Sequence, residues 1–326
     1  MRKVLVITSK ADLHADYVIR KMADRGVSFA RFNSDELPSI LRVAYRLTRE
    51  HEVWNNSGRK KLSLFEPGEP LSVWYRKPFI SRFEVNSKKS VTAFVMRETD
   101  AYVADLVVSL NMAKWVNHPE ANRVAGNKLA QLRLAHDLGI RVPRTLVTND
   151  PQSAVDFAES IQPAGMIYKT LTYPFIEETV TTFRSVYTST VHLSPEKFRA
   201  IEMAPCLFQE QIQKKYELRV TVVGQCVFAA RIYSQDQEET ALDWRRDQHK
   251  VALRQEAVTL EPEVRRVCLA ITERLGLIFG AIDLIMTPSG EYVFLEINPN
   301  GQWLWKEVLL GLEISEALIN ELARQE

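Results

Sequence analysis

The stretch GAIDLIMTPSGEYVFLEINPNG, residues 280–301, carries the strongest structural signal in the sequence. It contains two apolar, β-prone runs at 281–286 and 292–297, separated at 287–290 by a turn signal with proline and glycine. This pattern predicts two neighbouring strands that a tight turn makes antiparallel. The acidic residues inside these runs indicate a bound cation or another partner, because a carboxylate without a partner is costly to bury among apolar side chains.

Three side chains with oxygen ligands occupy these strands, namely Asp283, Glu296 and Asn298. Alternation at period two puts Glu296 and Asn298 on one face, and antiparallel pairing brings Asp283 near Glu296. Mg²⁺ prefers oxygen ligands and is commonly held by one or two carboxylates together with substrate phosphates. The three residues are therefore candidate magnesium ligands; polar positions on an exposed strand face are the alternative.

The N-terminal part predicts an α/β fold. Strand, helix and strand patterns follow one another at 4–7, 12–26 and 27–32, an order that favours a parallel sheet with buried strands. The later elements expected here are a hairpin within 41–65 with its turn at 55–58, a strand at 73–76 and a helix at 87–110.

The remaining elements predict a smaller central unit and a C-terminal domain. They are a helix at 119–138, a strand at 145–147, a helix at 151–160, a strand at 166–169, a Thr-rich hairpin at 179–191, a helix at 195–203, a strand from 207, a hairpin of 218–223 with 227–232, and a helix at 263–275. Because 326 residues exceed what one core usually serves, we expect an N-terminal α/β domain at 1–115, a central α+β lid domain at 116–206 and a C-terminal domain at 207–326.

Composition limits the class of protein. Hydrophobic residues make up 46% and charged residues 25% of the chain, the ordinary range of a globular protein. The net charge of +1 is spread along the chain, so neither nucleic acid nor an anionic membrane is an expected partner. Cys206, Cys226 and Cys268 have no CxxC spacing and predict reduced, structural cysteines. The first apolar run is too short for a signal peptide, so a cytoplasmic location is expected.

Two lysines are candidate phosphate ligands. Lys169 ends the predicted strand at 166–169, and Lys128 lies on the predicted helix after Asn117-His118-Pro119. A strand-terminal lysine aimed into a cleft can neutralise phosphate charge during phosphoryl transfer. For Lys128 the alternative is a solvated helix face.

The segment around Glu210, Gln211 and Ile212 passes from a strand to a loop, and Glu217 opens the next strand. The backbone of such a hinge can bind an adenine edge, and an acid shortly beyond it can accept hydrogen bonds from ribose hydroxyls.

Two arginines lie on paired strand patterns, Arg219 and Arg231. We expect both to point inward, where a fixed guanidinium suits phosphate or an oxyanion. A surface ladder of salt bridges with Glu217 is the alternative.

In this order, from Asn117 to Gly301, the residues resemble the ATP-grasp superfamily. The resemblance implies an ATP-grasp fold that uses ATP and Mg²⁺, with two ions expected, to convert a carboxylate into an acyl phosphate for attack by an amine, thiol or hydroxyl. It assigns Lys128 and Lys169 to the nucleotide phosphates, Glu210, Gln211 and Ile212 to the adenine hinge, Glu217 to ribose, Asp283, Glu296 and Asn298 to magnesium, and Arg219 and Arg231 to the reacting phosphate. One departure is the absence of glycine directly after Lys169, so hydroxyls or an ordered lid are expected to cover the phosphates.

Within that superfamily the chain resembles the graspetide (microviridin-type) peptide maturases, relatives of the ribosomal-protein glutamate ligases. The stretches that carry this resemblance are VWYRKP at 73–78, NHP at 117–119, DWR at 243–245 and NPNGQWLW at 298–305. It implies a ligase that joins Asp or Glu side chains of a ribosomal precursor peptide to Ser or Thr hydroxyls or Lys amines, and so forms macrocycles. The implied partner is a precursor with leader and core, and a homodimer is a candidate assembly.

Two other functions stay open at this point. One is an ATP-grasp ligase that adds a free amino acid to a small peptide or protein. The other is a non-catalytic ATP-dependent peptide-binding module, against which the set of Asp283, Glu296 and Asn298 argues.

The resemblance also implies that the central domain binds the leader. The candidate surface is the predicted hairpin at 179–191 with the helix at 195–203. The acidic candidates for contact with a basic leader are Glu177, Glu178, Glu196 and Glu202, and further peptide contacts are expected from Asp243 and Arg245. An ordinary solvated helix is the alternative.

Overall fold

The computed structural model of the chain describes residues 2–37, 40–47, 52–57, 61–65, 69, 71–78, 89–172, 175–177, 183–244 and 253–324. The candidate site residues Glu178 and Arg245 lie outside the described residues, and so does the side chain of Glu177. Within the described ranges, no helix combines the length and the apolar character needed to cross a membrane.

A parallel sheet organises the N-terminal part, as the sequence predicts. Its strand order is β2-β1-β6-β7, with β1 (Lys3–Thr8), β2 (Phe29–Asn33), β6 (Leu71–Tyr75) and β7 (Lys114–Val116). Helix α1 (Leu13–Asp24) covers one face and α2 (Lys89–Ser109) covers the other. Asp12 starts α1 because its carboxylate accepts the backbone N–H groups of His14 and Ala15.

A second N-terminal sheet is antiparallel and contains β3 (Arg42–Leu47), β4 (Glu52–Ser57) and β5 (Lys61–Phe65). The predicted turn at 55–58 was wrong for residues 55–57. Asn55 pairs with Ser63 and Ser57 with Lys61, so these residues belong to β4, whereas position 58 lies outside the described residues.

The predicted helix at 119–138 is two helices, α3 (Pro119–Ala125) and α4 (Lys128–Asp137). Asn127 separates them because its side chain donates to the carbonyls of Arg123 and Val124 at the end of α3, while its own carbonyl accepts from the Gln131 N–H of α4. Lys128 therefore occupies the first position of α4.

The central part is an antiparallel sheet with order β12-β9-β13-β8, formed by β8 (Thr145–Thr148), β9 (Met166–Lys169), β12 (Ser189–Thr190) and β13 (Cys206–Glu210). Helices α5 (Pro151–Ser160) and α6 (Pro195–Glu202) pack on it. The hairpin predicted at 179–191 is displaced, since β10 (Phe175–Glu177) pairs with β11 (Phe183–Ser185), whereas β12 joins β9.

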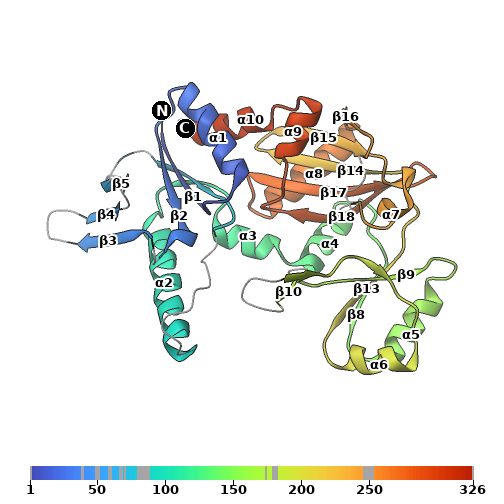
Figure 1. Ribbon diagram of the computed structural model, residues 1–326. Helices are drawn as coiled ribbons and strands as arrows, with labels where there is room; N and C mark the ends of the chain where they lie inside the picture. The colour runs from blue at the N-terminus through green and yellow to red at the C-terminus, as the bar shows by residue number, and fades with distance from the viewer. Residues whose placement is uncertain are drawn as a thin grey trace.

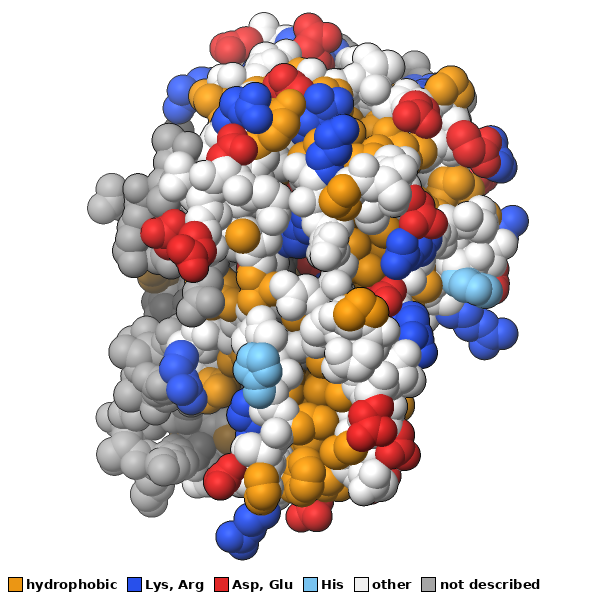
Figure 2. All heavy atoms as spheres, turned by 90° about the vertical axis from the view of Figure 1, so that its right-hand side faces the viewer, with side chains coloured by type: hydrophobic (Ala, Val, Ile, Leu, Met, Phe, Trp, Pro, Cys, Tyr) orange, Lys and Arg blue, Asp and Glu red, His pale blue; other side chains and the backbone are white. Residues whose placement is uncertain are grey.

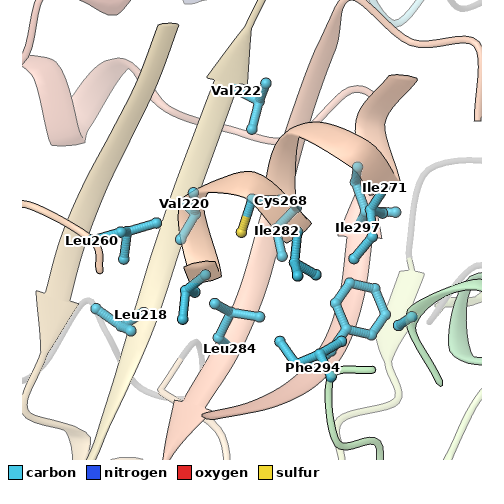
Figure 3. Packing of buried hydrophobic residues seen from close by; sticks show 14 of the residues in the cluster. Leu218, Val220, Val222, Leu260, Cys268, Ile271, Ile282, Leu284, Phe294 and Ile297 are labelled. Atoms are coloured by element: carbon cyan, nitrogen blue, oxygen red, sulfur yellow. The ribbon is translucent and has the colours of Figure 1, made fainter. Parts of the chain in front are cut away.

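The C-terminal part contains an antiparallel sheet, here called the catalytic sheet, with order β16-β15-β14-β17-β18. Its strands are β14 (Tyr216–Val223), β15 (Cys226–Ile232), β16 (Gln255–Val258), β17 (Phe279–Met286) and β18 (Tyr292–Asn298). One face packs against α4 and α8 (Pro262–Arg274), and Figure 3 shows the buried side chains of this core, among them Ile271, Ile282 and Phe294. Burying one such side chain contributes about 1.5–3 kcal/mol. Strand β16 was not expected from the sequence. The short elements η1 (Ser34–Glu36), η2 (Ser234–Asp236) and α7 (Glu238–Ala241) complete the described chain before the last helices.

Two C-terminal helices, α9 (Leu304–Leu310) and α10 (Ile314–Ala323), return the chain to the N-terminal sheet. Figure 1 shows α10 beside α1, and α10 contacts β1, β6, β7 and β14. Val18, Trp303 and Leu318 share one buried cluster, so the N-terminal and catalytic sheets are joined by a common apolar core.

Candidate active site

A cleft of about 1130 Å³ lies between the central sheet and the catalytic sheet. The central sheet contributes Lys169 and the hinge at 209–212, and the catalytic sheet contributes Glu217, Asp283 and Glu296. In Figure 2, which views the molecule from the side of α5 and α7, basic and acidic side chains gather around the recess between the upper and lower parts. The cleft exceeds the roughly 300–1000 Å³ of typical small-ligand pockets, so it has room for a nucleotide and a substrate side chain.

The predicted acid pair is formed. Asp283 on β17 and Glu296 on β18 are direct cross-strand partners, and a register shift follows Asp283. Asn298 lies two residues further along β18 and is exposed, as is expected from strand alternation.

The donor set fits a magnesium ion. Among the described residues, no group of three or more His, Cys, Asp or Glu side chains could hold a metal ion. Asp283, Glu296 and Asn298 supply two carboxylates and an amide oxygen, which is the hard-oxygen set that Mg²⁺ uses when substrate phosphates complete its coordination.

Arg219 joins this group from β14. It is the cross-strand partner of Asp283, and its Nη1 donates to Asp283 Oδ1 at 2.9 Å in a buried ion pair. Its Nη2 donates to the Gln302 carbonyl at 3.2 Å. Gly301 permits this contact, because a Cβ there would lie 2.6 Å from Arg219 Nη2 and 2.4 Å from the Ala281 Cβ.

Arg231 does not join the group, and the expectation that both arginines point the same way was wrong. Arg231 is the cross-strand partner of Leu218, which belongs to the core under α4 and α8. Directly opposed residues share a face, so Arg231 lies on the opposite face from Arg219. There its Nη1 donates to Glu256 at 2.7 Å, and its guanidinium stacks 4.4 Å from the Tyr216 ring centre.

Lys128 faces the acid pair instead of solvent. Its Nζ lies 3.8 Å from Glu296 Oε2 and donates to the Thr170 carbonyl at 2.6 Å. The second contact ties Thr170, which directly follows Lys169, to the first residue of α4.

The backbone N–H groups of the hinge differ in their hydrogen bonds. The N–H groups of Glu210 and Gln211 donate to the carbonyls of Arg144 and Gly165, whereas the Ile212 N–H makes no hydrogen bond within the described residues. An adenine edge can use that donor. The Glu210 side chain is structural, because its Oε1 accepts from the Arg144 N–H at 3.1 Å.

Glu217 lines the same cleft and is buried. Burial raises the pKa of its carboxyl group, while Lys214, whose Nζ donates to Glu217 Oε1 at 2.9 Å, acts in the opposite direction. The candidate ribose acid is thus held in place by a lysine that the sequence analysis did not single out.

The candidate peptide contacts are dispersed. Glu196 and Glu202 are exposed on α6 and are not among the residues that line the cleft. Asp243 is buried and lines the cleft beside Trp244. The structure thus brings Asp243, but not the α6 acids, to the cleft.

The most unusual group that the sequence analysis missed is Lys306, in the first turn of α9 and 1% exposed. Its Nζ donates to Gln255 Oε1 and lies 3.8 Å from the Trp305 ring centre and 5.3 Å from that of Trp244. Burial, with the positive charge of Arg219, lowers the pKa of Lys306 to about 6. The only sequence signal was its place directly after Trp305.

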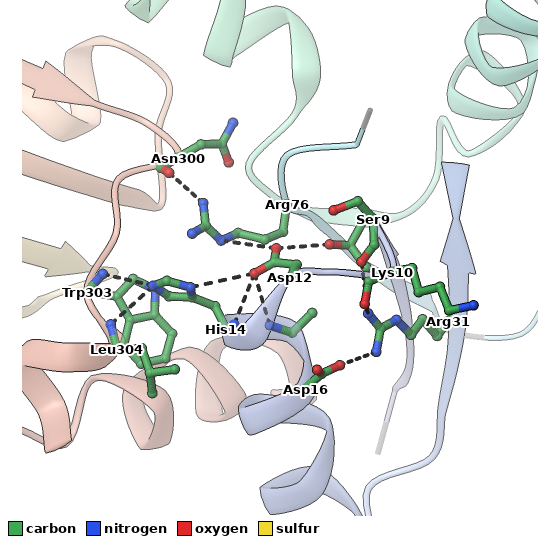
Figure 4. Close-up of polar contacts among 12 residues, drawn as sticks. Ser9, Lys10, Asp12, His14, Asp16, Arg31, Arg76, Asn300, Trp303 and Leu304 are labelled. Atoms are coloured by element: carbon green, nitrogen blue, oxygen red, sulfur yellow. Dashed lines mark hydrogen bonds and ion pairs between the residues drawn. The ribbon is translucent and has the colours of Figure 1, made fainter. Parts of the chain in front are cut away.

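A second missed network ties the loop after Asn298 to the N-terminal sheet (Figure 4). Arg76, 2% exposed, donates from Nη1 to the Asn300 carbonyl at 2.5 Å, and its Nε lies 3.7 Å from Asp12 Oδ2. His14 Nε2 accepts the backbone N–H groups of Trp303 and Leu304 at 3.1 and 3.2 Å.

The protonation states in this network follow from its contacts. Desolvation lowers the pKa of His14, so a neutral imidazole with its proton on Nδ1, towards Asp12, explains the two N–H groups at Nε2. Desolvation alone would raise the pKa of Asp12, but the His14 hydrogen bond and the charge of Arg76 outweigh it and lower this pKa to about 2.

Asn117 connects the two sheets directly. Its Oδ1 accepts the N–H groups of Ile278 and Phe279 at 2.9 and 2.8 Å, and its Nδ2 donates to the carbonyls of Phe279 and Pro299. Asn117 thus fixes the start of β17 and the loop after β18, and these two strands carry the candidate ligands Asp283, Glu296 and Asn298.

Two family models match almost the whole chain. Residues 3–123 match the MvdD pre-ATP grasp domain, and residues 125–322 match the RimK-like ATP-grasp domain. The chain is similar to a RiPP-associated ATP-grasp ligase of Chryseobacterium gregarium in complex with ADP and a leader and core peptide, at 28% identity and a TM-score of 0.89 over 99% of this chain and 96% of that chain. It is also similar to the macrocyclase MdnC of Microcystis aeruginosa MRC bound with precursor peptide MdnA, at 26% identity and a TM-score of 0.83 over 99% of both chains. Among curated proteins, the alpha-aminoadipate–LysW ligase LysX of Sulfolobus acidocaldarius is 23% identical over 274 residues, which cover 76% of this chain and 90% of that protein.

Proposed function

The chain belongs to the RimK-like ATP-grasp family, and from this premise we propose that it is a peptide macrocyclase that acts on a ribosomal precursor with leader and core segments. The reaction joins Asp or Glu side chains of the core to Ser or Thr hydroxyls or Lys amines. The observation that carries the proposal is the likeness over 99% of the chain to a ligase in complex with ADP and a leader and core peptide.

The residues of the cleft fit the first step, in which a substrate carboxylate oxygen attacks the γ-phosphorus of ATP and ADP leaves. Lys128 and Lys169 offset phosphate charge, the Ile212 N–H binds the adenine edge, and Glu217 accepts hydrogen bonds from the ribose. Arg219 places its guanidinium beside Asp283, where negative charge gathers on the transferring group.

When bound, magnesium would be held by Asp283, Glu296 and Asn298, and it would neutralise phosphate charge there; two ions are the finer form of this proposal. In the second step, the hydroxyl or amine of the same peptide attacks the acyl carbon, and phosphate leaves. Trp244, which is 7% exposed and lines the cleft, helps to exclude water that would hydrolyse the acyl phosphate.

The leader is proposed to bind the central domain through the stretch 179–191, which contains β11 and β12, and through α6. The protein is proposed to act as a homodimer. The support for this leader surface is the position of Glu196 and Glu202, which are exposed and lie outside the cleft, so a basic leader can bind without blocking ATP. Reversing both charges (Glu196→Lys with Glu202→Lys) should weaken leader binding and leave basal ATP hydrolysis intact. Unchanged affinity for the leader would move the surface elsewhere.

The likeness to LysX favours a second candidate, a ligase that adds a free amino acid. Incubation of a Thr- and Glu-rich precursor peptide with ATP and Mg²⁺, with or without free glutamate, separates the two. A macrocyclase releases one ADP per ring, and the peptide loses the mass of one water each time. A gain of peptide mass when free glutamate is present, and no loss of water in its absence, would contradict the proposal.

A further inference from the structure

The segment that follows β15, residues 234–244, forms one side of the cleft and is here called the cleft wall. It contains η2 and α7. Its residues that line the cleft are Gln235, Glu238 and 241–244. The cleft wall has hydrogen bonds of its own, since Thr240 Oγ1 donates to the Ser234 carbonyl and Gln235 Nε2 donates to the Ala241 carbonyl, both at 2.9 Å. Its internal shape is therefore fixed locally, whereas its position depends on what holds it from outside.

Lys214 joins the cleft wall to the proposed nucleotide site. Its Nζ donates to the Leu242 carbonyl at 2.8 Å and to Glu217 Oε1 at 2.9 Å. The side chains of Lys214 and Glu217 are 10% and 6% exposed, so both hydrogen bonds are shielded from water. One ammonium group thus holds the proposed ribose acid and a backbone carbonyl that lies two residues before Trp244.

The charge of Glu217 depends on these contacts. Burial raises the pKa of Glu217, Lys214 and the Ser234 hydroxyl lower it, and the nearby charge of Asp283 raises it. A buried carboxylate that loses its cation partner is strongly destabilised or takes up a proton. A protonated carboxyl group is a weaker acceptor for the ribose hydroxyls. Lys214 and the cleft wall therefore maintain the form of Glu217 that binds ribose.

The same contacts link ribose binding to the position of the cleft wall. Ribose hydroxyls donate best to a charged Glu217, and a charged Glu217 keeps the Lys214 ammonium beside it and beside the Leu242 carbonyl. A ligand that binds one arrangement of a network more tightly shifts the whole network towards that arrangement, and the effect is reciprocal. A bound ribonucleotide is thus expected to hold the cleft wall in place.

We propose that Lys214 is a positioning residue that couples ribose binding at Glu217 to the placement of the cleft wall, so that this side of the cleft is complete only when a ribonucleotide is bound. The assignment rests on the nucleotide site of the proposed function. A nucleotide without ribose hydroxyls fills the adenine and phosphate contacts but leaves the cleft wall loosely held. Lys214 acts through Glu217 and the Leu242 carbonyl, not by contact with the reacting atoms.

The first experiment follows amide hydrogen exchange of the cleft wall by mass spectrometry. The full-length protein is saturated with Mg²⁺ and either ADP or dideoxy-ADP, which lacks both ribose hydroxyls, so no turnover occurs. In the wild type, ADP should slow exchange at the cleft wall at least about fivefold more than dideoxy-ADP does. In Lys214→Met the two nucleotides should give equal exchange rates. Equal rates with the two nucleotides in the wild type would overturn the coupling.

The second experiment measures the Kd of each nucleotide by titration calorimetry. The wild type should bind ADP at least about tenfold more tightly than dideoxy-ADP, or about 1.4 kcal/mol, because hydrogen bonds to a charged group are lost with the hydroxyls. Lys214→Met should reduce this ratio to within about twofold, and Lys214→Arg should restore much of it. A general loss of stability would not produce that pattern. A full preference for ADP in Lys214→Met would contradict the proposal.

Two more variants complete the test. Lys215→Met is the matched control, because Lys215 is the next residue but is exposed and is not among the residues that line the cleft, so it should match the wild type. Glu217→Gln keeps the size of the side chain and should abolish the preference for ADP even where Lys214→Met does not fold. A preference that survives in Glu217→Gln would refute the role of this carboxylate.

The coupling and the proposed function fail in different ways. If the two nucleotides and the Lys214 variants differ as stated, but no precursor peptide loses the mass of water with ATP, the coupling stands and the proposed function fails. If rings form normally, but Lys214→Met keeps the wild-type exchange rates and nucleotide preference, the proposed function stands and the coupling fails.

Discussion

Lys306 gives the sharpest physical prediction, because it is a buried amine whose state of charge the fold controls. The difference between an ordinary lysine pKa of 10.5 and about 6 corresponds to roughly 6 kcal/mol at 1.36 kcal/mol per pKa unit. The rings of Trp305 and Trp244 act in the other direction, but a desolvated cation–π contact contributes only about 2 kcal/mol. Desolvation therefore wins, and Lys306 is expected to be neutral in the folded protein at pH 8.

The consequence for stability has a definite sign. Between pH 6 and 10.5 the unfolded chain binds a proton at Lys306 that the folded protein does not, so stability rises with pH. The destabilisation by buried Lys306 is complete below its pKa in the folded protein, about 6, and disappears above its pKa in the unfolded chain, 10.5. Lys306→Met removes this dependence. The free energy of unfolding of the wild type, relative to that of Lys306→Met, should therefore increase by about 1.4 kcal/mol per pH unit, or about 2.7 kcal/mol from pH 7 to pH 9.

Urea unfolding at pH 7, 8 and 9, followed by tryptophan fluorescence, measures this difference at constant ionic strength. Lys21→Met is the matched control. Desolvation lowers the pKa of Lys21, but its hydrogen bonds to Glu307 and Glu316 outweigh this and raise the pKa, so its contribution is fully present below 10.5 and constant over this range. Parallel stability curves for wild type and Lys306→Met would refute the reasoning, since they would mean that Lys306 is protonated in the fold.

Three further predictions concern the candidate active site. Glu296→Gln keeps the size of a proposed magnesium ligand but removes its charge, so ADP release should fall at least about 10²-fold; near-normal release would remove it from the site. Arg219→Ala should reduce kcat by a similar factor. Arg231→Ala, on the other face of the sheet, should leave kcat within about twofold. Equal losses of kcat in the two variants would contradict the strand register. Gly301→Ala places a methyl group 2.6 Å from Arg219 Nη2 and should lower kcat with little change in ATP affinity, which equilibrium nucleotide binding and steady-state kinetics test together.

The cross-strand pair of Asp283 and Glu296 could be predicted from the sequence alone. The two apolar runs are close in sequence, and the turn between them leaves one sensible pairing, so alternation sets which side chains share a face. Helix α5 was predicted for a similarly local reason: Pro151 starts it, and Asp150 caps it through hydrogen bonds to the next two donors, the N–H groups of Gln152 and Ser153.

The orientation of Arg231 needed the register of the whole catalytic sheet. Its own strand shows alternation, but the face that is buried depends on α4 and α8 packing over Leu218. The break before Lys128 escaped prediction as well, because the apolar pattern continues across it and only the hydrogen bonds of Asn127 reveal two helices.

What the sequence determined by itself was the order of local elements and the chemical types that they carry, because propensity, alternation and turn residues act over a few neighbours. Only the tertiary structure decided which charges lose water and which segments meet. Burial between α9 and β16 lowers the pKa of Lys306 to about 6, and Asn117 reaches Phe279 across 162 residues of sequence. Desolvation depends on everything packed around a group, and most of those neighbours are distant in the chain.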